Sequence, residues 1–499
     1  MPPLKIDHAE NTLGWDGSGH DTLHEAEGCR MTSAVVVGSG PNGLAAALTL
    51  AAAGVRVTVI EAADTPGGGT RSSELTLPGL IHDECSGFHP LLLGSAFVRR
   101  FDLAGAGLTF RWADAEFAHP LDGGRGATLW RSIGKTASAL GPDGPAWHGV
   151  FAPLAERFDA IGAEFLRPML HVPRHPVSLA RFGLRAAPPV SVLGRRWRTP
   201  EARALFGGAA AHALRPFGGV LSSAIGVALT TAAHAYGWPV AEGGSAAITD
   251  AILARAREHG VTVETGRTVR SIDELDADIV MLDTSPRAAL QIAGHRMPRR
   301  ARSAYRRYRY GPAAFKVDFA VAGGVPWTHE PSRRAGTVHL GGGFDEMAAT
   351  ERQVTAGRMP ERPFVLVGQQ YVADKTRSAR DVHPLYAYAH VPAGYTGDAT
   401  GAIVAQIERF APGFRERVQA THVRSAADMA GHNANYVGGD ILTGANTPSQ
   451  LVFRPRPALD PYATAAPGVY LCSAATPPGA GAHGMCGYNA ARSALRALR

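Results

Sequence analysis

The fold of this chain is decided by residues 34–61, which read AVVVGSGPNGLAAALTLAAAGVRVTVIE. Residues 34–37 predict a short buried strand, because they are apolar and run into a glycine turn. Residues 41–53 predict a helix with Pro41 in its first turn, and residues 55–60 predict a second strand. This order of strand, turn, helix and strand is typical of a dinucleotide-binding unit.

The turn in this unit reads GSGPNG at residues 38–43. Gly38 permits the tight turn, Gly40 lets the backbone approach a pyrophosphate, and Gly43 lets helix and strand pack closely. The helix N-terminus offers N–H groups and a partial positive charge to the phosphates. Glu61 ends the second strand, where its carboxylate is placed to accept hydrogen bonds from a ribose and disfavours NADP.

Two further motifs extend the prediction from a dinucleotide to FAD. The glycine run 67–69 lets the chain pass close to a flat or charged ligand, and Arg71 is placed to pair with a pyrophosphate. Residues 468–489 predict a strand, a glycine loop and a helix that starts near Asn489. Backbone N–H groups at that helix start would suit the edge of a reduced flavin where negative charge develops.

The composition is that of an ordinary globular protein, with 45% hydrophobic and 19% charged residues. The net charge of +7 permits an anionic cofactor or membrane surface but demands neither, and no nucleic acid partner is expected. The basic run 298–310 is expected to be a solvated helix face, with contact to phosphates or lipid headgroups as the alternative. Four cysteines without a C-x-x-C pair predict neither disulfides nor a metal site, which favours a cytoplasmic location.

Two segments need separate interpretation. Residues 1–30 are polar and lack the apolar region of a signal peptide, so we expect a disordered extension with Met31 as the functional start. The uncharged stretch 216–241 is long enough to cross a bilayer, but it is rich in Gly, Ser, Thr and Ala. A buried helix beside a cavity is the favoured interpretation of that stretch.

The three motifs together resemble the flavoproteins with two dinucleotide-binding domains, and more closely the phytoene desaturase-like (phytoene dehydrogenase-related) FAD oxidoreductases. The likeness runs from about residue 34 to the C-terminus. It is also carried by LPGLIHDECSGFHPL, YGWPVAEGGSAAITDAI, YGPAAFKVDFAV and PGVYLCSAATPPGAGAHGMCGYNAAR. The resemblance implies FAD as cofactor, held by Gly38, Gly40, Pro41, Asn42, Gly43, Glu61, Gly68, Gly69, Arg71, Val269, Ser473, Gly484 and Met485. Ser473 and Ala480 stand where relatives usually have glycine, so the approach of the cofactor is expected to differ slightly there.

The resemblance also implies an α/β fold, in which a discontinuous Rossmann-like FAD-binding domain carries an inserted substrate domain of mixed sheet and helices. The nucleotide-binding pattern appears at the start, middle and end of the chain, which places the FAD-binding domain at residues 31–95, 240–300 and 440–499. The substrate domain is then expected at residues 96–239 and 301–439.

The expected activity is dehydrogenation (desaturation) of a lipophilic small molecule by hydride transfer to flavin N5. A flavin-dependent amine oxidase is one alternative, which would place a lysine near the flavin; Lys316 is the lysine in the most suggestive context. A non-redox isomerase or binding protein with structural FAD is the other. A peripheral membrane contact is compatible with a lipophilic substrate, and the sequence predicts neither the electron acceptor nor the oligomeric state.

Histidines are the first candidates if the reaction needs an acid or a base. His483 lies in the glycine loop expected beside the flavin, and His89 follows the cofactor loop. His212 and His234 flank the apolar stretch and are weaker candidates. No Ser-His-Asp order and no metal-ligand cluster stands out.

Overall fold

The computed structural model describes residues 31–499. The predictions made for residues 1–30 lie outside this range. Within it, a five-stranded sheet has the order β16 (Val469–Leu471), β10 (Ile279–Leu282), β1 (Ser33–Val37), β2 (Arg56–Ile60) and β9 (Thr262–Glu264). Every neighbouring pair is parallel, as expected for a dinucleotide-binding sheet.

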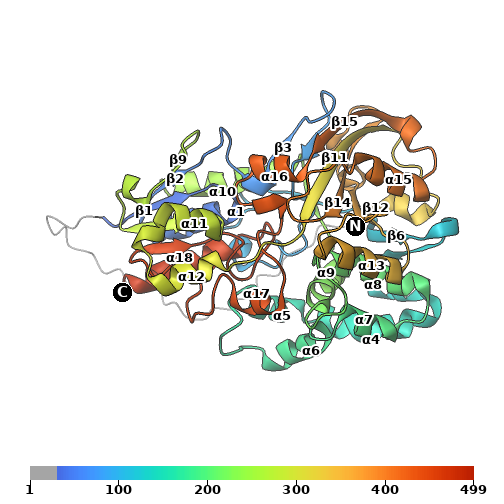
Figure 1. Ribbon diagram of the computed structural model, residues 1–499, viewed down its shortest axis with the longest axis horizontal. Helices are drawn as coiled ribbons and strands as arrows, with labels where there is room; N and C mark the ends of the chain where they lie inside the picture. The colour runs from blue at the N-terminus through green and yellow to red at the C-terminus, as the bar shows by residue number, and fades with distance from the viewer. Residues whose placement is uncertain (1–30) are drawn as a thin grey trace. The chain divides into compact units, whose positions relative to one another are not determined.

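Helices cover both faces of this parallel sheet (Figure 1). One face packs against α1 (Pro41–Ala51), α10 (Ala246–Glu258) and α18 (Met485–Ala497). The other face packs against α11 (Pro286–Ala293) and α12 (Arg299–Arg306). A sheet buried on both sides needs strands that are apolar throughout, which explains the runs AVVV and IVML.

A second, mostly antiparallel sheet has seven strands over the same described range. Its order is β15 (Val418–Arg424), β11 (Ala313–Ala322), β14 (Val382–Val391), β13 (Val365–Gly368), β12 (Ala335–Leu340), β6 (Ala115–Pro120) and β7 (Gly126–Leu129). One face packs against the helices α4 (Gly144–Ala155), α6 (Pro176–Ala186), α8 (Pro200–Ala211), α9 (Ser223–Ala235) and α13 (Phe344–Thr355), which gather together in Figure 1. The opposite face packs against α15 (Thr400–Phe410).

Shorter elements connect these layers. Two small antiparallel ladders pair β3 (Ser72–Ser73) with β4 (His82–Asp83) and β5 (Phe110–Arg111) with β8 (Val240–Ala241). The remaining helices are α2 (Ala96–Arg100), α3 (Ile133–Ala139), α5 (Phe158–Phe165), α7 (Val190–Leu193), α14 (Gln370–Ala373), α16 (Ala426–His432) and α17 (Pro448–Phe453).

The predicted α/β class is confirmed, and the first strand–helix–strand unit lies within two residues of its predicted bounds. One predicted boundary is wrong. The last helix starts at Met485 and not near Asn489, because Gly484 has a φ of 70° and ends the loop one turn earlier. The segment 97–235, for which no strand is predicted from the sequence, contains β6 and β7.

Strand β6 escaped prediction because its polar residues interrupt the apolar pattern. Glu116 is buried and accepts a hydrogen bond from the Trp238 N–H, and His119 is buried against the Gly342 carbonyl. Residues 32–499 form one compact unit, so the domain boundaries within it stay predictions. The three segments assigned to the FAD-binding domain do supply all the strands of the parallel sheet.

Candidate functional site

One cavity of about 1290 Å³ extends from the glycine turn after β1 to helices α6 and α9. Pockets for a single small ligand typically have roughly 300–1,000 Å³, so this cavity has room for a dinucleotide and a second molecule. The predicted site residues that line it are Gly38, Gly40, Pro41, Asn42, Glu61, Gly68, Gly69, Arg71, His89, Val269 and His483. The remaining predicted residues, Gly43, Ser473, Gly484 and Met485, are not part of the lining.

Two glycine-rich backbone segments, residues 38–43 and 67–69, meet closely at the β1 end of the cavity. Gly38 has a φ of 101°, which glycine adopts without strain. A side chain at Gly43 would lie 2.2 Å from the Gly38 carbonyl oxygen, and one at Gly68 would lie 3.1 Å from the Gly40 Cα. The two glycine runs therefore pack against each other beside the start of α1, which no side chain caps. An uncapped helix N-terminus of this kind suits a phosphate.

Glu61 ends β2 with its carboxylate at the cavity wall. Its Oε2 accepts hydrogen bonds from the N–H and the hydroxyl of Ser39, at 2.8 and 2.6 Å. Its Oε1 accepts one from the Ala63 N–H at 2.9 Å and lies 3.7 Å from Nη2 of Arg71. The neighbouring groups thus hold Glu61 in place, while its contact with a ribose and the pairing of Arg71 with a pyrophosphate stay predictions.

Asp283 is a lining residue that the sequence analysis missed. It follows β10, and its Oδ2 accepts a hydrogen bond of 2.9 Å from the Gly43 N–H. Burial raises the pKa of Asp283 to about 7, and the negative charge of Glu61 adds to the rise. A partly protonated carboxyl repels a phosphate less than a carboxylate does. The position of Asp283 directly after a predicted strand could have revealed it from the sequence. The carboxyl ends of neighbouring parallel strands meet at one edge of the sheet, so Asp283 is expected close to the glycine turn.

The loop after α16 also lines the cavity and was not predicted. Asn435 accepts a hydrogen bond of 2.7 Å from the Ser285 N–H and donates one of 2.9 Å to the Asp283 carbonyl. These two bonds fix the loop to the end of β10. No local motif marks this loop, because its partners are about 150 residues away in the chain.

The polar end of the cavity fits FAD. Two buried atoms there, Oδ1 of Asn42 and Oγ1 of Thr284, have no hydrogen-bond partner within residues 31–499, and both side chains line the cavity. A buried polar atom without a partner costs about 1–3 kcal/mol, so a polar ligand at this place is stabilising. The glycine cradle, the uncapped helix and Glu61 supply the contacts that a pyrophosphate and a ribose need.

His483 lines the cavity with its ring almost fully buried. Its Nδ1 accepts a hydrogen bond of 3.1 Å from the Met485 N–H, so the neutral ring carries its proton on Nε2. Burial lowers the pKa of His483 to about 4, which keeps the ring neutral near pH 7. His483 therefore has an N–H to donate and no free lone pair, which suits a hydrogen-bond donor better than a base.

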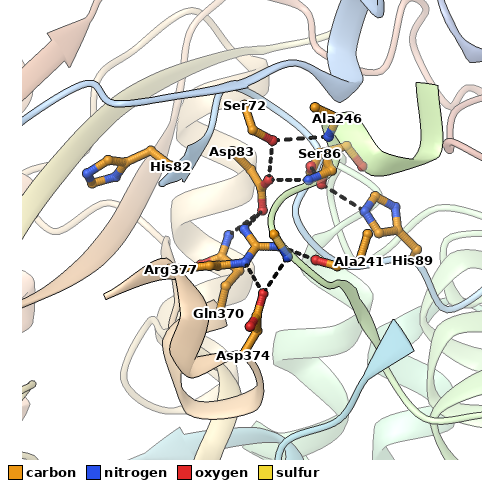
Figure 2. Close-up of polar contacts among 12 residues, drawn as sticks. Ser72, His82, Asp83, Ser86, His89, Ala241, Ala246, Gln370, Asp374 and Arg377 are labelled. Carbon is orange, nitrogen blue, oxygen red and sulfur yellow. Dashed lines mark hydrogen bonds and ion pairs between the residues drawn. The ribbon is translucent and has the colours of Figure 1, made fainter. Parts of the chain in front are cut away.

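His89 also lines the cavity and is held from behind by a buried polar network, which Figure 2 shows. Its Nε2 lies 3.0 Å from Oγ of Ser245, whose N–H donates to Asp83 at 2.7 Å. Asp83 pairs with Nη1 of Arg377 at 2.6 Å, and Nε of Arg377 donates to Asp374 at 3.1 Å. The Arg377 side chain is fully buried, so this network is part of the core that positions His89.

The network also decides which nitrogen of His89 carries the proton. The Ser245 hydroxyl donates to the Ser86 carbonyl at 2.6 Å, so it accepts from the Nε2–H of His89. Nδ1 of His89 then holds a lone pair, and it has no partner within residues 31–499. Burial lowers the pKa of His89 to about 4. Nδ1 of His89 is therefore a hydrogen-bond acceptor at the cavity, and the Nε2–H of His483 is a hydrogen-bond donor.

Away from these histidines the cavity wall is largely apolar. Its lining includes Leu179, Phe182, Ile225, Leu229, Trp238 and Leu366. Helix α9 comes from the uncharged stretch 216–241 and lines the cavity, which confirms the predicted buried helix. None of the helices in residues 31–499 has the length and apolar character needed to cross a membrane.

Comparisons with known proteins agree with this geometry. Residues 36–96 match the family of NAD(P)-binding Rossmann-like domains. Over 301 residues the chain is 23% identical to pyridine nucleotide-disulfide oxidoreductase domain-containing protein 2 of Rattus norvegicus, with 52% of each chain covered. Over 266 residues it is 30% identical to hydroxyneurosporene desaturase of Cereibacter sphaeroides, covering 48% of this chain and 50% of that one. The solved structure of putrescine oxidase bound to putrescine has a TM-score of 0.59 and 18% identity, covering 94% of this chain and 99% of that one.

The fold and the polar end of the cavity define an FAD-binding flavoprotein of the Rossmann type. The chain spans at most about half the length of the curated relatives it matches, and the solved structure shows likeness of fold alone. Within that class, the likeness to hydroxyneurosporene desaturase agrees with the predicted resemblance to the phytoene desaturase-like FAD oxidoreductases.

Proposed function

We propose that this protein is an FAD-dependent oxidoreductase that desaturates a lipophilic small molecule. The observation that carries the proposal is that one cavity joins a polar cradle suited to FAD with a wall of apolar side chains. An apolar wall holds its ligand by removing apolar surface from water and offers few polar contacts. The matched relative named hydroxyneurosporene desaturase supports the same reaction type.

In this proposal FAD, when bound, supplies the hydride acceptor at N5. The turn at residues 38–43 and Glu61 hold the dinucleotide, and the apolar wall orients the substrate and excludes water. His89 is the group able to accept a proton or a hydrogen bond through Nδ1, and His483 donates a hydrogen bond through Nε2. In this proposal His89 therefore acts as an acceptor of a proton or hydrogen bond, and His483 acts as a hydrogen-bond donor.

The amine oxidase alternative has less support from the described residues. Lys316 does not line the cavity; its ammonium group forms a buried ion pair with Asp318, two positions along β11. Burial alone would raise the pKa of Asp318, but Lys316 lowers it below its ordinary value, so Asp318 remains a carboxylate. A lysine bound in this way is not available beside a flavin.

The test of the proposed function is anaerobic reduction of the reconstituted flavoprotein. Lipophilic isoprenoid or polyene donors should bleach the flavin absorption bands, whereas putrescine should not. Bleaching by putrescine alone would favour the amine oxidase, and a yellow protein that no donor bleaches would favour a non-redox role. Failure to take up FAD would reject every flavin-based function.

Glu61→Ala is expected to weaken FAD binding by roughly 10–150-fold, because a hydrogen bond to a charged group contributes about 1.5–3 kcal/mol. Titration of the apoprotein with FAD, followed by flavin fluorescence, measures this change. Glu264→Ala is the matched control, because Glu264 ends the neighbouring strand β9 with its side chain about half exposed. Equal FAD affinity in both variants would reject the ribose assignment.

We further propose a peripheral membrane contact around α6. The segment 166–199 contains seven arginines and no acidic residue. It exposes the apolar side chains Met169, Leu170, Val172, Val177, Leu184 and Val192, with Val172 90% and Leu184 76% exposed. The inner side of α6 lines the cavity through Leu179 and Phe182. Exposed apolar side chains beside basic ones are typical of a surface that enters an anionic lipid interface.

The double substitution Val177→Glu/Leu184→Glu is expected to lower binding to phosphatidylserine-containing vesicles at least about tenfold, since it removes apolar surface and adds repulsion. Co-sedimentation measures the bound fraction, and binding by the unmodified protein should fall as salt is raised. Leu459→Glu is the control, because Leu459 is 93% exposed and lies outside this segment. Equal loss in the control, or no vesicle binding by the unmodified protein, would reject the contact.

A further inference from the structure

Among the polar side chains that line the cavity, Thr337 and His212 have hydrogen-bonding capacity that the described residues 31–499 do not use. Thr337 lies on β12, is fully buried and lines the cavity, and its Oγ1 has no partner in the described part of the chain. His212 follows α8 and lines the cavity, with its ring 5.4 Å from that of Trp238. Its Nε2 lies 2.8 Å from Nε2 of His339, while its Nδ1 has no hydrogen-bond partner within residues 31–499. An unused polar pair in an apolar wall suggests a ligand contact.

Two buried histidines behind the wall indicate where His212 carries its proton. Nε2 of His119 lies 2.8 Å from the Gly342 carbonyl oxygen, so it carries the proton and Nδ1 holds a lone pair. A side chain on Gly208 would lie 2.9 Å from Nδ1 of His119 and 2.7 Å from Nδ1 of His339. The Cα–H of Gly208 on this side therefore lies beside both nitrogens, and this weak donor suits a lone pair on each.

The same reasoning extends from His339 to His212. Nδ1 of His339 has no partner in the described range, and a buried N–H without an acceptor is strongly disfavoured. The neutral His339 ring thus carries its proton on Nε2 and donates it to His212. Burial lowers the pKa of His212 to about 3 and that of His339 well below its usual value, so both rings are neutral. His212 accepts at Nε2 and must present an N–H at Nδ1.

We propose that the Nδ1–H of His212 and the hydroxyl of Thr337 form a subsite that binds an oxygen atom on an otherwise apolar substrate. The inference rests on the proposed function, since it takes the apolar half of the cavity as the substrate site. Thr337 and His339 are two residues apart on β12 and face the same side of the sheet, which places both groups at one end of the cavity. The oxygen belongs to a carbonyl, hydroxyl or ether, whereas a protonated amine has no lone pair for His212.

The test compares farnesol with farnesene, which share a carbon skeleton and differ in the hydroxyl group. Quenching of tryptophan fluorescence reports binding, because Trp238 lines the cavity beside His212. The unmodified protein should bind farnesol more tightly than farnesene. His212→Phe and Thr337→Val should each weaken farnesol binding roughly 3–10-fold and leave farnesene binding within about twofold.

Thr128→Val is the matched control, because Thr128 is a buried threonine without a hydroxyl partner in the described range and does not line the cavity. His212→Asn, whose amide can donate from a similar position, should restore part of the preference for farnesol. No preference in the unmodified protein, or an undiminished preference in His212→Phe and Thr337→Val, would overturn the subsite. FAD content and anaerobic bleaching are scored separately, so a failed subsite and a failed oxidoreductase assignment remain distinguishable.

Discussion

Gly487→Ala should yield a protein that is markedly less stable and retains little FAD. Gly487 lies in the first turn of α18, where a Cβ would be 1.7 Å from the Asn42 carbonyl oxygen and 2.9 Å from the Ala46 nitrogen. Both atoms belong to the backbone of α1, so α18 has to move away from the helix that starts at the glycine turn. Overpacking usually costs about 1–3 kcal/mol, and a clash with backbone should cost at least about 3 kcal/mol.

Urea unfolding and the flavin-to-protein absorbance ratio measure the two effects of Gly487→Ala. The matched control is Gly149→Ala, because Gly149 lies in helix α4 and a Cβ there would meet no atom within 4 Å. This control should leave FAD content unchanged and raise the unfolding free energy by up to about 1 kcal/mol. If Gly487→Ala keeps its FAD and its stability, the close packing of α1 and α18 is wrong.

Arg377→Met should lower the unfolding free energy by about 3–5 kcal/mol, since it removes one member of a buried ionic network. Arg377 bridges Asp83 and Asp374, and it also donates to the Ala241 carbonyl at 2.6 Å. Its loss leaves two buried carboxylates without their cation. Because Asp83 anchors Ser245 and thereby His89, we also expect weaker substrate-dependent bleaching in whatever fraction stays folded.

The control for Arg377→Met is Arg334→Met, which breaks the half-exposed pairs with Asp114 and Glu330 and should cost no more than about 1 kcal/mol. Adding Asp83→Asn and Asp374→Asn to Arg377→Met should recover part of the loss, since the uncompensated charges are then removed. If Arg377→Met alone is as stable as Arg334→Met, the proposed role of the buried ionic network is wrong.

The pH dependence of stability should differ between the unmodified protein and Arg377→Met. Burial alone would raise the pKa of Asp83, but Arg377 and hydrogen bonds hold it below the ordinary value of 3.8. A carboxyl with a lowered pKa in the folded state contributes stability above its unfolded pKa and loses it as the pH falls through the folded one. The unmodified protein should therefore keep this contribution down to about pH 4. Arg377→Met should instead gain stability on mild acidification, because protonation removes the unpaired charge.

The cofactor half of the site could be predicted because its determinants are local in sequence. The glycine turn, the helix and Glu61 lie within residues 34–61, and their spacing alone predicts a cradle whose lining residues the structure brings together. Their contacts with FAD stay predictions. The second glycine run is close enough in sequence to pack against the first.

The rest of the site depends on distant contacts that spacing does not reveal. Asp283 meets Gly43 only because β10 pairs with β1, and Asn435 meets Asp283 across a large sequence separation. The sequence indicated His212 only as a histidine beside an apolar stretch. Which of its ring nitrogens carries the proton follows from its contact with His339 and from the position of Gly208 beside His339. Such properties belong to the assembled core and not to any segment of the chain.

The sheet order has a consequence for how the protein is made. Strand β16 and helix α18 complete the parallel sheet, yet they leave the ribosome after every strand of the seven-stranded sheet. Until then β10 has one edge without a strand partner, and α1 lacks the helix whose Gly487 packs against the backbone of Asn42 and Ala46. An exposed parallel edge is prone to misassociation, so the nascent chain should depend on chaperones. Cofactor loading should therefore wait until β16 and α18 have been synthesised, which a translation stalled before residue 467 would reveal as a flavin-free intermediate.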